Sequence, residues 1–223
     1  MNYELLILSL RMLAYLTIFT TSFVIAFSGA MMPGPFMTMM ISESAKSGAW
    51  VGPKMIVGHA ILELVLLLAL FFGLAPLFKK DLFFIIIAIA GGAIMIWMAQ
   101  SMFRTLPKLE IKTSTTSNNS MNLYLAGILM SLANPYWIIW WATIGLGYVL
   151  HSQKLGFAGI AFFFIGHILG DLVWYSAISI AIGKGRKFFS NKVYRILVGT
   201  CAVFLTGFAI WLIYDGINKL ISI

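Results

Sequence analysis

Charged residues are scarce in this chain of 223 residues. Asp, Glu, Lys and Arg together make up 10% of the sequence, whereas ordinary globular domains carry roughly 25%. Hydrophobic residues account for 61%, and the mean hydropathy is +0.97. This composition excludes an ordinary soluble domain and predicts an integral membrane protein.

Cysteine is nearly absent from the sequence, and two common catalytic motifs are wholly absent. The lone cysteine, Cys201, excludes an internal disulfide. The sequence contains neither the H-E-x-x-H motif of zinc proteases nor the G-x-S-x-G motif of serine hydrolases. We therefore expect no enzymatic activity and no cofactor.

Long apolar runs are what the sequence has in abundance. Runs of roughly 20 residues are long enough to cross a bilayer as helices, and their pattern lacks the strict alternation of a membrane β-barrel. We predict an all-α integral membrane protein with six transmembrane helices. These helices are expected near residues 13–32, 51–78, 82–103, 122–150, 156–182 and 196–220.

The formal net charge of +8 is explained by the loops between these runs. Placing both termini outside puts ten of the fifteen Lys and Arg residues in cytoplasmic loops, as the positive-inside rule requires. We therefore predict a multi-pass protein of the cell membrane, in contact with anionic lipid and not with nucleic acid. The ten are Lys46, Lys54, Arg104, Lys108, Lys112, Lys184, Arg186, Lys187, Lys192 and Arg195, and the other five are Arg11, Lys79, Lys80, Lys154 and Lys219.

A polar segment rich in Ser, Thr and Asn, residues 106–120, lies between the third and fourth runs. It predicts a loop joining two halves, about 1–105 and 121–223, of a single transmembrane domain spanning residues 1–223. Three helices in each half would give the halves opposite orientations in the membrane. This is the 3+3 inverted repeat of many secondary transporters.

Each half carries a Gly-His pair followed by an acid, in "GHAILELV" (58–65) and "GHILGDLV" (166–173). His59 and Glu63, like His167 and Asp171, are four residues apart and share a helix face. A charge at the bilayer centre costs about 2.5–3.5 kcal/mol on insertion scales, so these residues should face the interior. They could relay protons, hold a substrate ammonium group, bind a divalent metal, or simply join helices by hydrogen bonds.

Prolines interrupt the first and fourth apolar stretches at equivalent places, Pro33-Gly34-Pro35 and Asn134-Pro135. Proline breaks a continuous helix, and Asn-Pro is typical of an N-cap followed by the first helical residue. We predict broken helices whose exposed N-termini bind an anion such as a substrate carboxylate. The alternative is a kink, or a helix end at the membrane surface.

Three tryptophans, Trp137, Trp140 and Trp141, follow the second break. We expect them to face lipid or the membrane interface, as most membrane tryptophans do, although they could line a substrate path. The Gly166-x-x-x-Gly170 spacing is typical of close helix packing.

The segment "SGAMMPGPFMTMMISESAKSGAWVGPKMIVGHAILELVLLLAL" resembles the opening half of the LysE-type translocator family of amino-acid exporters. "AGGAIMIWMAQSMF" (90–103) is similar to the glycine-rich third helix of that family. The resemblance implies ion-driven efflux of an amino acid or similar small metabolite from a prokaryotic cytoplasm. The paired Gly-His-x-x-x-acid motifs depart from the amino-acid exporters and keep a divalent-metal exporter open.

The sequence thus predicts a secondary transporter, coupled to protons, with a small-molecule substrate. Homo-oligomerisation is left open. The alternative hypothesis of a non-transporting scaffold predicts that the buried polar residues can be replaced without loss of function. The expected substrate-binding residues are Gly34, Pro35, Asn134 and Pro135. The expected coupling residues, which would be the ligands in the alternative metal exporter, are His59, Glu63, His167 and Asp171.

Overall fold

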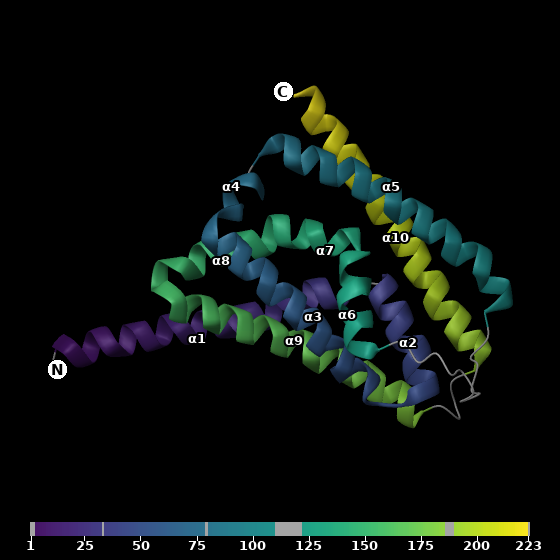
Figure 1. Ribbon diagram of the computed structural model, residues 1–223, viewed down its shortest axis with the longest axis horizontal. Helices are drawn as coiled ribbons and strands as arrows, with labels where there is room; N and C mark the ends of the chain where they lie inside the picture. Colours follow the sequence, from purple (N-terminus) through teal and green to yellow (C-terminus); the bar gives the residue numbers. More distant parts are fainter. Residues whose placement is uncertain (1–2, 33, 79, 110–121, 186–189, 223) are drawn as a thin grey trace.

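The computed structural model describes residues 3–32, 34–78, 80–109, 122–185 and 190–222. These residues are helical almost throughout and form no strand (Figure 1). Short π-helical turns at Leu70–Leu74 and Trp141–Gly145 continue α3 into α4 and α7 into α8. The helices are α1 (Tyr3–Ala30), α2 (Pro35–Ser47), α3 (Val51–Ala69), α4 (Ala75–Phe78), α5 (Asp81–Thr105), α6 (Leu123–Leu132), α7 (Pro135–Trp140), α8 (Leu146–Ser152), α9 (Gly156–Lys184) and α10 (Asn191–Ile221).

Five helical segments are long and apolar enough to cross a membrane, and α6 is a shorter apolar helix. The fourth expected span, residues 122–150 with a break at Asn134-Pro135, contains α6, which ends at Leu132, and α7, which begins at Pro135. Asn134 between them is extended and caps α7. The chain turns again at Gly156, whose φ of 69° suits glycine. The five segments are Tyr3–Ala30, Val51–Leu77, Asp81–Lys108, Pro135–Lys184 and Asn191–Ile221.

The helices preceding the polar loop pack mainly against helices that follow it. The most extensive contacts join α1 to α9, α3 to α6, and α5 to α10. In Figure 1 α5 and α10 lie side by side as a pair. Each contact therefore connects the first half of the chain to the second.

Glycines permit the closest of these approaches. A Cβ atom on Gly58 of α3 or on Gly127 of α6 would overlap a backbone carbonyl oxygen of the facing helix. A Cβ atom on Gly166 or Gly170 of α9 would stand 2.5 or 2.7 Å from carbonyl oxygens of α1. The close packing predicted from the Gly166-x-x-x-Gly170 spacing is therefore confirmed.

Two buried apolar clusters contact the histidines of the two Gly-His pairs. One contains Met55, Tyr175 and Phe36, whose ring centroid lies 5.6 Å from that of His59. The other contains Trp141 and Phe163, whose ring centroids each lie 5.9 Å from that of His167. Many large apolar side chains elsewhere are exposed on the outer helix faces, as expected where the surrounding solvent is lipid. The two histidines thus lie against buried apolar cores.

Candidate functional site

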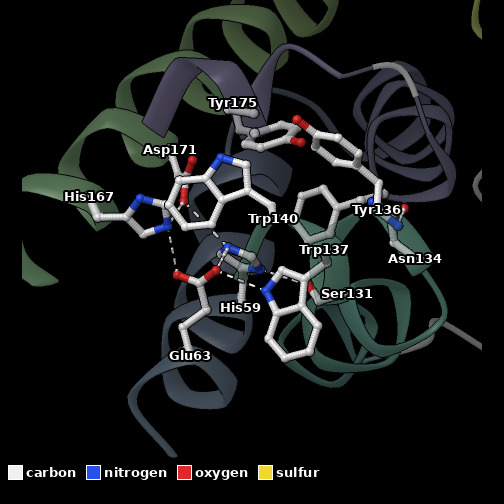
Figure 2. A pocket seen from close by; sticks show the side chains of 13 residues that line it. His59, Glu63, Ser131, Asn134, Tyr136, Trp137, Trp140, His167, Asp171 and Tyr175 are labelled. Atoms are coloured by element: carbon white, nitrogen blue, oxygen red, sulfur yellow. Dashed lines mark hydrogen bonds and ion pairs between the residues drawn. The ribbon is translucent and has the colours of Figure 1, made fainter. Parts of the chain in front are cut away.

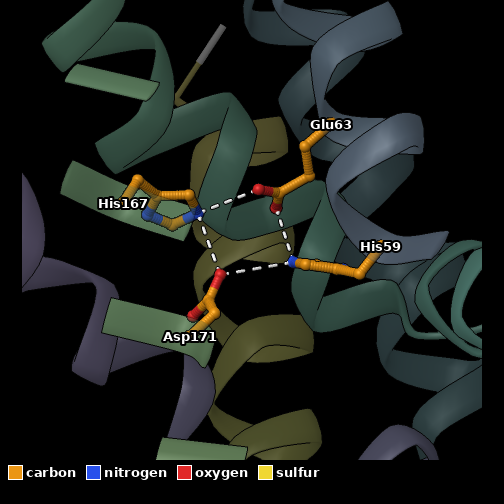
Figure 3. Close-up of side chains that lie close together, drawn as sticks. All are labelled: His59, Glu63, His167 and Asp171. Carbon is orange, nitrogen blue, oxygen red and sulfur yellow. Dashed lines mark ion pairs between the residues drawn. The ribbon is translucent and has the colours of Figure 1, made fainter. Parts of the chain in front are cut away.

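Four of the predicted residues meet where α3 contacts α9. His59 and Glu63 project from successive turns of α3, and His167 and Asp171 from successive turns of α9, so that they form a closed ring (Figure 3). The Glu63 side chain is 1% exposed, and those of His167 and Asp171 are each 4% exposed. His59 is the most accessible member at 12%.

The ring alternates imidazoles with carboxylates. His59 Nε2 lies 3.0 Å from Glu63 Oε1 and 3.4 Å from Asp171 Oδ2. His167 Nε2 lies 3.0 Å from Glu63 Oε2 and 3.4 Å from the same Asp171 oxygen. Each acid therefore contacts both histidines, and neither carboxylate is buried without a neighbouring group that can carry positive charge.

A serine fixes the orientation of the His59 ring. His59 Nδ1 lies 2.7 Å from Ser131 Oγ, and that hydroxyl donates its own proton to the Gly127 carbonyl at 2.7 Å. Because a hydroxyl has one proton to donate, Ser131 must accept from His59, and Nδ1 must carry hydrogen. In the neutral ring, Nε2 then presents its lone pair to the two acids.

Two indole groups hold Glu63 from the other side. Trp137 and Trp141 donate Nε1–H to Glu63 Oε1 at 2.9 and 2.8 Å, and Figure 2 shows Trp137 pointing at this oxygen. Trp140 stacks on His167, with centroids 4.6 Å apart and an angle of 28° between the rings. The expectation that these tryptophans face lipid is wrong: Trp140 and Trp141 are 3% and 0% exposed.

Replacing Trp141 by Phe should weaken the site without changing its apolar character. The variant keeps an aromatic ring but removes one of the two donors to Glu63 Oε1. Because hydrogen bonds to charged groups contribute about 1.5–3 kcal/mol, we expect a lower melting temperature in detergent and weaker substrate binding. Trp211→Phe is the matched control, since Trp211 is exposed on α10. Equal melting temperatures for the two variants would contradict the role given to the indole.

A cavity of about 40 Å³ lies beside the ring. All four ring residues line it, together with Ser131, Asn134 and several aromatic side chains, of which Figure 2 labels Tyr136, Trp137, Trp140 and Tyr175. Phe36 is a further aromatic residue that lines the cavity. A cavity of this size holds a few water molecules.

The two predicted helix starts meet at the edge of this cavity. A Cβ atom on Gly34, the N-cap of α2, would lie 3.5 Å from Asn134 Nδ2. Asn134 lines the cavity, whereas Gly34, Pro35 and Pro135 are not among its lining residues. Pro33 lies outside the described residues.

The two helix starts differ in their free hydrogen-bond donors. Asn134 Oδ1 accepts from Tyr136 N–H at 3.2 Å, and the Asn134 carbonyl accepts from Trp137 N–H at 3.0 Å, so these donors of α7 are occupied. The start of α2 has no side-chain cap. Within the described part of the chain, the amide Nδ2 of Asn134 has no acceptor. The donors available to an anion are therefore the first N–H groups of α2 and this amide.

Comparison with known families decides the class of protein. Residues 27–216, which include the ring, both helix starts and the three tryptophans, match the LysE type translocator family. This chain belongs to that family. It is therefore a multi-pass membrane translocator, and the resemblance read from its first half is confirmed.

Two relatives match over nearly their whole lengths. This chain is 22% identical to "Putative amino acid efflux protein YcgF" of Bacillus subtilis, over 93% of this chain and 100% of the relative. It is 25% identical to "Chemotactic transduction protein ChpE" of Pseudomonas aeruginosa, over 87% of this chain and 96% of the relative. No solved structure matches the chain.

Sequence reasoning missed the groups that surround the ring. Ser131, Phe36 and Tyr175 carried no motif. Trp137 and Trp141 did carry a signal, because residues four apart on a helix share a face and both follow a helix start that the sequence predicts to bind substrate. Spacing relative to Asn134-Pro135 could therefore have placed them inside.

Proposed function

We propose that this translocator is a secondary carrier that exports an amino acid or similar small metabolite across the cytoplasmic membrane, coupled to protons. One observation supports the proposal above all. A buried ring of four ionisable side chains and a helix start meet at one small cavity, and both halves of the chain contribute residues to it. The name of the Bacillus subtilis relative supports an amino acid as the substrate class.

We place the substrate carboxylate at the adjoining helix starts, Gly34-Pro35 and Asn134-Pro135. The uncapped N-terminus of α2 and the amide of Asn134 supply N–H donors there. The substrate ammonium group would then lie toward the carboxylates of Glu63 and Asp171. This arrangement matches the two charges of a zwitterion with opposite partners at opposite sides of one cavity.

The ring carries the coupling protons in this proposal. Each carboxylate contacts both imidazoles, so a proton gained or lost at one group changes the charge balance of all four. Movement of α3 against α9 would change the distances within the ring. Proton binding and the arrangement of the two halves are thereby linked through the same contacts.

Transport requires the cavity to open alternately to each side of the membrane. Contacts of α1 with α9 and of α6 with α3 join the first helix of each half to the second main helix of the other. This reciprocal pattern supports a 3+3 inverted repeat within one domain, with halves 1–105 and 121–223 rocking around the shared site. By the positive-inside rule, both termini would lie outside.

The test is transport by purified protein in lipid vesicles. Vesicles loaded with labelled threonine, leucine, lysine or glutamate should release at least one of them faster when a proton gradient is imposed. The His59→Gln/His167→Gln variant should lose the dependence on the gradient. His151→Gln is the matched control, because the exposed His151 lies outside the ring. Release in the wild type that ignores the gradient would contradict proton coupling.

A further inference from the structure

We propose that the ring of His59, Glu63, His167 and Asp171 is a four-coordinate binding site for one divalent transition-metal cation of the Zn²⁺ class. Its ligands would be Nε2 of each histidine and one oxygen of each carboxylate. The inference rests on the proposed function only in placing the ring on the transport path; binding of the cation is independent of amino-acid export.

Four buried atoms of the ring residues lack the hydrogen bonds that burial normally demands. Glu63 Oε2, His167 Nε2 and Asp171 Oδ2, together with His167 Nδ1, have no hydrogen-bond partner among the described residues. His167 Nε2 lies 3.0 Å from Glu63 Oε2 and 3.4 Å from Asp171 Oδ2 without the alignment of a hydrogen bond. Buried polar atoms left this way are costly, and the first three face one another across the ring (Figure 3).

The spacing of the ligand atoms fits a metal ion. Zinc binds histidine nitrogen and carboxylate oxygen at about 2.0–2.2 Å, which separates the ligands of a tetrahedron by about 3.3–3.6 Å. With Glu63 Oε2 as the ligand oxygen, His167 Nε2 lies 3.0 Å from it, and Asp171 Oδ2 lies 3.4 Å from Nε2 of each histidine. The four atoms all lie within 4.8 Å of one another, so small side-chain rotations would bring them around one ion.

The surrounding groups resemble the outer partners of metal ligands. Metal-binding histidines usually donate their other ring N–H to a neighbouring acceptor; His59 Nδ1 does so to Ser131, whereas His167 Nδ1 has no acceptor among the described residues. Glu63 Oε1 is anchored by the indoles of Trp137 and Trp141. Those contacts leave His59 Nε2 and Glu63 Oε2 facing the ring.

The charge and donor types also select this class of ion. Two carboxylates neutralise a divalent cation, and two neutral imidazoles complete a set that suits zinc and its neighbours better than Ca²⁺ or Mg²⁺, which prefer all-oxygen sites. The ligands come from α3 of the first half and α9 of the second. A bound cation would therefore join the two halves.

The experiment uses metal-free, purified full-length protein titrated with Zn²⁺ and with Co²⁺. We expect one ion per chain, and intense visible absorption from four-coordinate Co²⁺. The Glu63→Gln/Asp171→Asn variant should bind ~100-fold more weakly or worse, since even outer partners of ligands are worth roughly 10–100-fold. His151→Ala and Cys201→Ser are controls that remove the other histidine and the lone thiol.

The melting temperature is a further readout, which does not depend on transport. Zn²⁺ should raise the melting temperature of the wild type and of both controls, because a ligand that binds only the folded state stabilises it, and should leave that of the ring variant unchanged. Absence of Zn²⁺ and Co²⁺ binding in folded wild type would overturn the inference, as would equal binding by the ring variant. Amino-acid export in the vesicle assay could stand in either case, so the two failures are distinguishable.

Discussion

Glu63→Gln should reduce proton-driven export by about 100-fold or more. Glu63 is the one ring residue that contacts both histidines through separate oxygens and also accepts both indole N–H groups. If the oxygen of the glutamine side chain still accepts the two indole N–H groups, the NH₂ group of that side chain takes the place of Oε2 beside His167 Nε2. The ring then loses a charge that it needs for proton exchange, and a 100-fold loss corresponds to about 3 kcal/mol of interaction.

The same substitution should also lower stability. Removing one partner from a buried ion-pair network leaves the others uncompensated, at a cost of ~3–5 kcal/mol. Melting temperature in detergent and initial export rate in vesicles are the two measurements. Glu43→Gln is the matched control, because Glu43 is only partly buried and pairs locally with Lys46 at 2.6 Å. Export by Glu63→Gln at the rate of Glu43→Gln would exclude the ring from coupling.

Gly58→Ala is expected to be the most disruptive single-methyl change. The added Cβ would overlap the Tyr124 carbonyl oxygen of α6, and a backbone atom cannot turn away as a side chain can. The contact between α3 and α6 must therefore open, which we expect to cost about 3 kcal/mol or more, the upper end for overpacked interiors. Opening it would also draw His59 away from Ser131, now at 2.7 Å.

Gly207→Ala supplies the control for the helix itself. Nothing lies within 4 Å of a Cβ atom placed on Gly207 of α10, and alanine favours a helix over glycine by about 0.8–1.0 kcal/mol. Gly207→Ala should therefore be neutral or stabilising, while Gly58→Ala melts at a lower temperature and exports poorly. Similar melting temperatures for the two variants would show that α3 and α6 do not approach as closely as the contact of Gly58 with the Tyr124 carbonyl oxygen implies.

The sequence alone determined the class of the protein and the positions of its polar residues. Membrane helices can be recognised from their length and hydropathy because the bilayer core excludes charge. For the same reason, each ionisable residue within such a helix is easily identified as exceptional. Spacing of four residues correctly put His59 beside Glu63 and His167 beside Asp171, since that relation is internal to one helix. Asn134-Pro135 likewise indicated a helix start from local chemistry alone.

Only the tertiary structure decided how the two pairs combine. The contacts of Glu63 with His167 and of Asp171 with His59 depend on the register of α3 against α9. That register is set by packing across the whole interface. The tryptophans show the same limit: lipid is as apolar as a protein core, so hydropathy could not tell that Trp137 and Trp141 turn inward. The buried carboxylate of Glu63 requires hydrogen-bond donors, and the indoles of Trp137 and Trp141 supply them. Only the packing of the helices against one another shows that these groups meet.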